Sequence, residues 1–139
     1  MDREIIFRAK PALTNALGDG ESLFTLEDKW YEGYLMSPNR LCLYDDNLGV
    51  LPYFEINPNT VGEYSGRTDK NNVRMFEGDI VKGLFYHERP MLAVVKFKNG
   101  SFGLEWNRSG AKTFNPFTGM CNIEYEVLGN IFDNADLLK

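Results

Sequence analysis

Apolar and polar residues alternate in short runs along this chain, and turn-forming residues separate the runs. Such alternation indicates β-strands with one buried face, whereas an amphipathic helix would repeat its apolar residues every three or four positions. The pattern therefore predicts a mostly β protein of bent antiparallel sheets with tight hairpins and little helix. The expected strands cover residues 4–9, 29–36, 40–44, 51–56, 60–64, 80–82, 92–98, 101–106 and 123–127.

Two short segments have a helical pattern. Leu13 and Leu17 are spaced as on one helical turn, although Gly18 and Gly20 stop this turn from growing. Near the end of the chain, residues 133–138 predict one capped turn that docks two leucines. The polar and glycine-rich segment at residues 107–122 is expected to be a mobile excursion.

The strongest local signal is Asn99-Gly100, which stands between two arms rich in β-branched and aromatic residues. This dipeptide favours a two-residue type I′ turn and therefore fixes the register of a hairpin. The opposite face, which carries Val94 and Glu105, is expected to meet water. The pairs expected on the buried face are Phe97 with Phe102, Val95 with Leu104 and Ala93 with Trp106.

Turn-forming residues are densest between positions 65 and 79. Glycine adopts positive φ without strain, and Asp or Asn side chains accept hydrogen bonds from nearby backbone N–H groups, so these residues close tight corners. Gly78 is expected to supply a positive φ or a bulge where the next strand begins. The structural turn residues that we expect are Gly66, Asp69, Gly78, Asp79, Asn99 and Gly100.

A chain of 139 residues has the usual size of one domain and needs one hydrophobic core. We expect a single compact domain over residues 1–139, with a β-hairpin part at about 1–60 and a barrel-like part at about 61–139. The short, closely spaced strands over residues 76–132 suit an SH3-like small barrel or a strongly bent sheet.

The composition excludes several classes of protein. With 43% hydrophobic and 25% charged residues, the chain is too apolar for a disordered protein. A formal net charge of -5 argues against a surface built mainly to neutralise phosphates or anionic lipid. No signal core or membrane-length apolar run occurs, and Cys42 and Cys121 are far apart, so we expect reduced cysteines in the cytosol.

Several motifs occur in order along nearly the whole chain. They lie at residues 3–9, 30–35, 60–64, 64–71, 76–81 and 125–134. Taken together, these motifs resemble the YopX-like family found in phages and prophages. The family usually has Gly where this chain has Asn72 and often has Pro where Ala135 stands, and neither difference threatens the fold because Asn also tolerates positive φ. The resemblance implies a mostly β protein of the bacterial cytoplasm, carried by a phage or prophage, with no catalytic residues to assign.

Candidate catalytic chemistry is sparse. His87 is the only histidine, so one chain cannot supply a two-histidine metal site. Glu77 and Asp79 would point the same way in a strand, and with His87 they support a hydrolase, the weakest of our hypotheses. A role for Asp79 in holding its turn is favoured instead. We expect a protein that is not an enzyme and has no cofactor and no metal.

Cations and aromatic rings are interleaved around the central turns, where they suit phosphate contacts and base stacking. The favoured alternative is that these rings are core residues and that the cations are solvated. The binding candidates are Arg67, Lys70, Arg74 and Tyr64, with Lys82, Phe76 and Tyr86 near them in sequence.

Our leading hypothesis is a non-enzymatic interaction module that binds a host or phage protein. Open strand edges and an aromatic-rich surface favour partner binding or a homo-oligomer formed by edge pairing. The alternative is a nucleic-acid-binding accessory protein, which the negative net charge disfavours. No membrane partner is expected.

Overall fold

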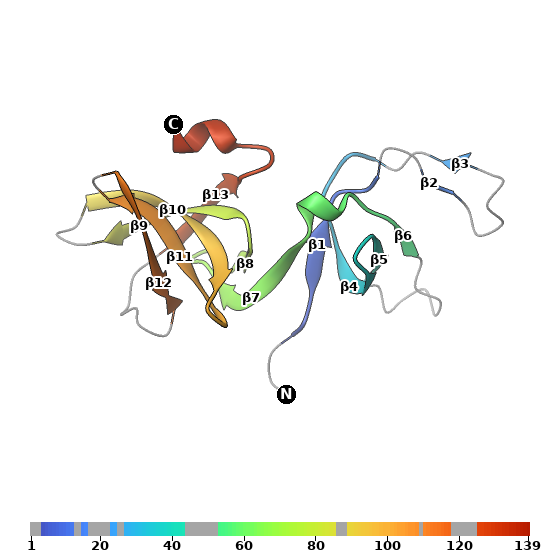
Figure 1. Cartoon of the computed structure of the whole chain (residues 1–139), viewed down its shortest axis with the longest axis horizontal. Helices are drawn as coiled ribbons and strands as arrows, with labels where there is room; N and C mark the ends of the chain where they lie inside the picture. Colours follow the sequence, from blue (N-terminus) through green and yellow to red (C-terminus); the bar gives the residue numbers. More distant parts are fainter. Residues whose placement is uncertain are drawn as a thin grey trace. The chain divides into compact units, whose positions relative to one another are not determined.

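The structure is a computed structural model, and it describes residues 4–12, 15–16, 23–24, 27–43, 53–85, 89–108, 110–117 and 125–139. The chain divides into two units, Met1–Tyr64 (unit 1) and Ser65–Lys139 (unit 2). Antiparallel strands dominate both units, which confirms the prediction of a mostly β fold (Figure 1). Within the described ranges, no helix is both long enough and apolar enough to cross a membrane.

Unit 1 contains an antiparallel sheet with the strand order β6-β5-β4-β1-β7. Its strands are β1 (Phe7–Ala9), β4 (Tyr31–Ser37), β5 (Arg40–Leu43), β6 (Tyr53–Glu55) and the first residues of β7 (Gly62–Thr68). The predicted hairpin across residues 37–39 is confirmed, because β4 and β5 pair directly. A separate pair, β2 (Asn15–Ala16) with β3 (Leu23–Phe24), occupies the region where a helical turn was expected. Leu13 and Leu17 themselves lie outside the described residues.

One face of this sheet forms the core of unit 1. Because side chains two positions apart on a strand share a face, apolar residues from several strands meet there. The buried residues are Ala9, Leu41, Phe54 and Ile56, and Phe7, Tyr31, Leu35, Leu43 and Val61 pack against them.

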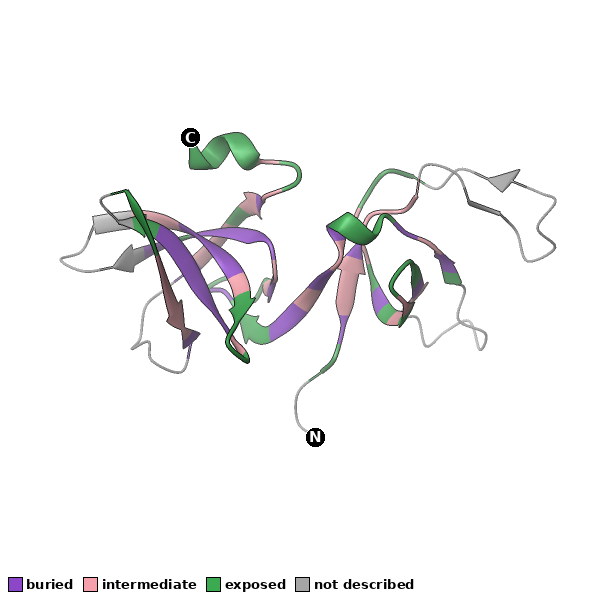
Figure 2. Ribbon diagram, viewed as in Figure 1, coloured by how far each residue is buried: buried purple, intermediate pink, exposed green. Residues whose placement is uncertain are grey.

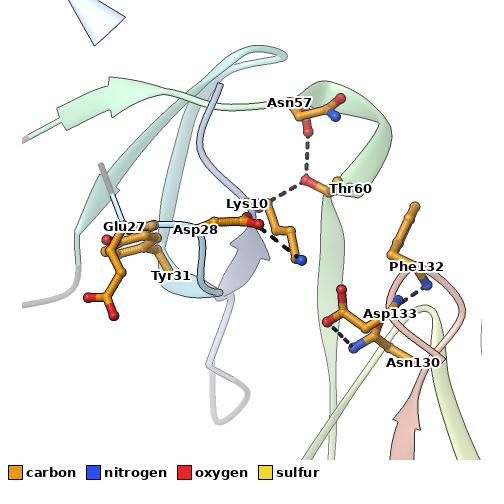
Figure 3. Close-up of polar contacts among 9 residues, drawn as sticks. All are labelled: Lys10, Glu27, Asp28, Tyr31, Asn57, Thr60, Asn130, Phe132 and Asp133. Carbon is orange, nitrogen blue, oxygen red and sulfur yellow. Dashed lines mark hydrogen bonds and ion pairs between the residues drawn. The ribbon is translucent and has the colours of Figure 1, made fainter. Parts of the chain in front are cut away.

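The 3₁₀ turn η1 (Pro58–Thr60) is tied to β1 by a buried threonine. The hydroxyl of Thr60 accepts a hydrogen bond from the backbone N–H of Lys10 (2.9 Å) and donates one to the backbone oxygen of Asn57 (2.7 Å) (Figure 3). The side chain of Lys10 also lies 3.8 Å from Asp28. One short side chain therefore satisfies two backbone groups that are shielded from water.

Unit 2 contains a five-stranded antiparallel sheet with the order β12-β11-β10-β9-β13. Its strands are β9 (Asp79–Phe85), β10 (Arg89–Lys98), β11 (Ser101–Arg108), β12 (Ala111–Pro116) and β13 (Tyr125–Asn130), and β8 (Arg74–Phe76) pairs separately with β7. The prediction of a mobile excursion over residues 107–122 is wrong for residues 111–116, which form β12. An edge strand needs only one partner, so a polar segment that ends in proline can fill this position.

The sheet of unit 2 is open. A closed barrel needs its two edge strands to pair with each other, but β12 and β13 lie at opposite edges of the described sheet. The outer edge of β13 bonds instead to the turn after β7. The N–H of Val127 donates to Asp69 Oδ2 (2.9 Å), and the oxygen of Tyr125 accepts from the N–H of Lys70 (2.9 Å). Of the two alternatives predicted for residues 76–132, an SH3-like small barrel and a strongly bent sheet, the described strands form an open sheet and not a closed barrel.

Strands β10 and β11 form the hairpin that the sequence predicted. Asn99 and Gly100 have φ values of 52° and 78°, the positive values that a type I′ turn requires. The register is confirmed along the described pairs of the two strands. One expectation is wrong, since Phe97 is 49% exposed. Phe97 stands beside the turn, at the end of β10, where its ring centroid lies 4.8 Å from that of Phe102.

The core of unit 2 lies under this hairpin. Buried residues run along the middle of β9, β10 and β11, while the hairpin tip is exposed (Figure 2). The buried residues of the core are Met75, Val81, Ala93, Val95, Phe102, Leu104, Trp106, Phe117 and Tyr125.

Candidate interaction groove

A groove opens on the other face of the β10–β11 hairpin, beside the C-terminal 3₁₀ turn η3 (Ala135–Leu138). We call it the C-terminal groove. Its volume of about 430 Å³ falls within the range of ligand-binding pockets, roughly 300–1,000 Å³, and it is open to solvent. Its apolar lining residues are Met91, Leu92, Val94, Ile131, Leu137 and Leu138.

This face was predicted to be exposed to water, and that prediction is wrong for its centre, because Val94 and Glu105 are both buried. The sequence does contain a signal for burial. Residues 91–95 are five apolar residues in a row, a pattern that indicates a strand covered on both faces rather than on one. The hairpin register placed Val94 on the face opposite the core. The apolar run at residues 91–95 indicates that this face is covered as well.

The polar lining of the groove is mainly cationic. Lys96, Lys112 and Lys139 line it together with Asn107 and one carboxylate, Glu105. Lysine side chains keep the ammonium group in water while their aliphatic stems cover apolar surface. The groove therefore combines an apolar lining with positive charge, although the whole chain has a formal net charge of -5.

Glu105 is buried beneath these lysines and is held in its ionised form. It accepts a hydrogen bond from Lys98 Nζ, and Lys112 Nζ lies 4.0 Å from its other oxygen. The hydrogen bond from Lys98 lowers the pKa of Glu105 below its ordinary value of 4.5, burial opposes this shift, and the charges of Lys98, Lys96 and Lys112 reinforce it. The local cations thus neutralise the buried carboxylate.

Removing the Lys98 ammonium group should reverse this balance. In Lys98→Met the pKa of Glu105 is expected to rise, because the hydrogen bond that lowers it most is lost while burial still raises it. The measurement is an NMR titration of the glutamate side-chain carboxyl carbons. Lys29→Met, an exposed position in unit 1, is the matched control and should leave that titration unchanged. A Glu105 pKa that does not move in Lys98→Met would contradict this account.

The turn after β13 fixes the position of η3. Asn130 is buried, and its Oδ1 accepts the N–H groups of Phe132 (3.0 Å) and Asp133 (2.9 Å). Its Nδ2 donates to Asp133 Oδ2 (3.2 Å), the bond drawn between these two residues in Figure 3. Asn134 Oδ1 accepts the N–H of Asn130 (3.1 Å), so its side chain does not cap η3, contrary to the predicted capped turn. Gly129 makes room for this contact, because a Cβ there would overlap Asn134 Oδ1. The two leucines of η3 are thereby held beside the groove while staying 38% and 45% exposed.

Two predicted binding candidates are engaged in contacts within unit 2. The guanidinium of Arg67 lies 5.0 Å from the ring centroid of Phe117, and its Nη2 donates to the backbone oxygen of the same residue (3.4 Å). Lys70 Nζ lies 3.6 Å from a carboxylate oxygen of Glu126. Two of the cations that were candidates for phosphate contacts therefore already have partners within unit 2.

The other candidates differ in their exposure. Tyr64 and Phe76 are buried, so neither ring presents an open face. Arg74 is half-buried on β8, and Lys82 is exposed on β9. Tyr86 lies outside the described residues.

Asp69, one of the predicted turn residues, is a buried carboxylate with backbone partners. Its Oδ1 accepts the N–H groups of Asn71 (2.8 Å) and Val73 (2.9 Å), and its Oδ2 accepts that of Val127 (2.9 Å). It therefore closes its own turn and joins that turn to β13. The glycines predicted at turns have positive φ: Gly66 (86°), Gly78 (94°) and Gly100 (78°).

The residues considered for hydrolysis do not form a described site. Asp79 is buried at the start of β9, and its Oδ2 accepts the N–H of Phe76 (2.8 Å), which is the structural role that the sequence favoured. Glu77 is half-buried, and His87 lies outside the described residues. Over the part of the chain that can be described, no group of His, Cys, Asp and Glu side chains is placed to hold a metal ion.

A family model described as YopX protein matches residues 21–139, which is most of the chain. The chain belongs to the YopX family. The match includes every residue that lines the C-terminal groove, so the groove is part of the YopX region. A search of curated proteins finds none that matches this YopX-family chain.

Proposed function

We propose that this YopX-family protein is a non-enzymatic interaction module, carried by a phage or prophage, that binds a host or phage protein in the bacterial cytoplasm. The observation that supports this function best is the C-terminal groove. Apolar side chains such as Leu137 and Leu138 remain exposed around it, next to lysines. Exposed apolar surface with a polar rim is typical of protein interaction sites.

The main polar groups of unit 2 support a binding role rather than a catalytic one. The carboxylates of Asp69 and Asp79 accept backbone N–H groups, and Glu105 is neutralised by lysines. A general base must be placed with good geometry for a substrate proton. These three carboxylates instead stabilise the fold.

A protein partner is favoured over nucleic acid. Nucleic-acid affinity depends on cations that neutralise phosphates and on aromatic faces that stack on bases. Here Arg67 lies over Phe117 and Lys70 beside Glu126. The formal net charge of -5 also opposes a long phosphate track.

The test combines light scattering with affinity capture. The mass of the purified protein is measured alone and with single- and double-stranded DNA and RNA at low and moderate salt, which also reports any homo-oligomer. Tagged protein then captures partners from nuclease-treated lysate of an infected bacterium, and each captured protein is purified and titrated back by calorimetry. The proposal expects saturable binding of a purified protein and no salt-sensitive mass shift with nucleic acid. Binding of nucleic acid alone, or catalytic turnover, would replace the proposal.

A further inference from the structure

The chemistry of the C-terminal groove restricts what it can bind. Its apolar residues favour a ligand with aliphatic or aromatic side chains, because covering such surface is favourable at roughly 25 cal/mol per Å². Its lysines favour a ligand with negative charge. A purely apolar ligand would leave the ammonium groups unused, and a purely acidic one would leave the leucines of η3 in water.

The positive charge in the groove exceeds the negative charge. Glu105 is the one carboxylate side chain among the lining residues, and Lys98, which does not line the groove, already bonds to it. The described ion pairs of Glu105 are with Lys98 and Lys112, whereas Lys96 acts on it through its charge from beyond ion-pair distance, and Lys139 is in none of the described ion pairs. These two ammonium groups are therefore placed to meet a carboxylate on a ligand.

The openness of the groove distinguishes a chain segment from a small molecule. Pockets for small molecules bury most of the ligand surface, typically 70–90%. The C-terminal groove is open to solvent, and one of its sides is a single 3₁₀ turn that carries two exposed leucines. A polypeptide segment can cover both the groove and these leucines while its outer side stays in water.

Nucleic acid fits the groove less well. Its lysines could meet phosphates, but a single-strand site also needs aromatic faces on which bases stack. Trp106 is the only aromatic residue among the lining residues described, and it is buried in the core of unit 2. The aliphatic character of the remaining apolar lining favours leucine-like side chains instead.

We propose that the C-terminal groove binds a short acidic segment of a partner protein, in which aliphatic side chains contact Leu92, Val94 and Leu138 while neighbouring Asp or Glu side chains pair with Lys96 and Lys139. This inference rests on the proposed function and names the partner chemistry of the same module. The partner segment has apolar and acidic residues in close alternation.

The probe is a fluorescein-labelled synthetic peptide of ten residues that alternates leucine with glutamate, and binding is followed by fluorescence anisotropy. Two matched peptides replace either every glutamate by lysine or every leucine by serine. The first peptide is expected to bind, more weakly at high salt because the lysine rim is exposed. Each replacement is expected to weaken binding by about tenfold or more, since both kinds of contact contribute.

Four variants locate the site. Lys139→Glu and Leu138→Ser change exposed groove residues and are expected to raise the Kd of the leucine–glutamate peptide by about tenfold. Lys29→Glu in unit 1 and Leu128→Ser on β13 are the matched controls; Leu128 is 42% exposed and does not line the groove. The controls should change the Kd by less than about twofold. Thermal unfolding of all four variants shows that the fold is retained, as their exposure predicts.

The outcomes separate this inference from the proposed function. Loss of peptide binding in the two groove variants alone supports the inference. No binding to the unmodified protein, equal binding of the lysine peptide, or equal loss in the control variants overturns it. If a captured partner binds Lys139→Glu and Leu138→Ser as tightly as the unmodified protein, the groove assignment fails while the interaction module stands. If no protein binds at all, the proposed function itself fails.

Discussion

Replacing Asp69 by alanine is expected to lower the free energy of unfolding by roughly 3 kcal/mol or more. The carboxylate is buried and accepts three backbone N–H groups, two within its own turn and that of Val127 on β13. Alanine leaves all three donors without this acceptor, and a hydrogen bond to a charged group contributes about 1.5–3 kcal/mol. The turn would also lose its connection to the sheet edge.

Urea unfolding followed by circular dichroism measures this effect. Asp136→Ala is the matched control, because Asp136 lies exposed on η3 and its substitution should change the free energy of unfolding by less than about 0.5 kcal/mol. Asp69→Asn should fall between the two, since its amide keeps one oxygen acceptor. A loss in Asp69→Ala no larger than that in Asp136→Ala would show that these hydrogen bonds do not stabilise the fold.

The same carboxylate gives the stability a defined dependence on pH. Burial raises the pKa of Asp69. The three backbone hydrogen bonds and the charge of Lys70 lower it by more than burial raises it, so the pKa lies below its ordinary value of 3.8. A lowered pKa in the folded state stabilises the protein above the unfolded value and loses that contribution as the pH falls through the folded value. The gap in stability between the unmodified protein and Asp69→Asn should therefore be constant near neutrality and shrink only below about pH 4.

Gly103→Ala is expected to destabilise the protein by roughly 3 kcal/mol, at the upper end of what overpacking costs. A Cβ at Gly103 would overlap the backbone oxygen of Asn115 and lie 2.7 Å from the Cα of Pro116. Both atoms belong to the backbone of β12, so no side-chain rotation can relieve the clash. The paired ends of β11 and β12 would have to separate.

Gly100→Ala is the informative comparison for this prediction. A Cβ at Gly100 meets nothing within 4 Å, but φ there is 78°, so the substitution costs only the strain of a left-handed alanine, roughly 1 kcal/mol. Chemical denaturation ranks the two variants, and hydrogen exchange should show faster exchange in β12 for Gly103→Ala alone. Equal losses in both variants would contradict the close approach of β12 to β11.

Local signals in the sequence predicted the parts of the fold that depend on neighbouring residues. Asn99-Gly100 gave the turn and register of the central hairpin, because both residues tolerate positive φ. Asp79 was expected to hold its turn and accepts the N–H of Phe76. Local signals could not decide between the two alternatives for residues 76–132, a small barrel and a strongly bent sheet, because strand closure depends on pairing between distant segments. Here the turn at Asp69 bonds to the edge of β13.

The candidate site was harder to predict, for the same reason. Arg67 and Lys70 were predicted as binding residues because they are near one another along the chain. In the structure, Arg67 lies over the ring of Phe117 and Lys70 lies beside Glu126. The groove instead joins the consecutive strands β10, β11 and β12 to η3, which follows β13 in the sequence. Only the apolar run at residues 91–95 indicated it, by showing that the outer face of β10 is covered.

The bonds that Asp69 and Lys70 make to β13 also limit how copies of this protein can stack. A sheet with two unpaired edge strands can bind another molecule at each edge, so that copies can add without limit. In unit 2 the described edge of β13 is already bonded to Asp69 and Lys70, which leaves β12 as the edge where another strand can add. If two molecules joined through β12, the β13 edges of the described sheet would already be bonded, so we expect this sheet to join two copies rather than many.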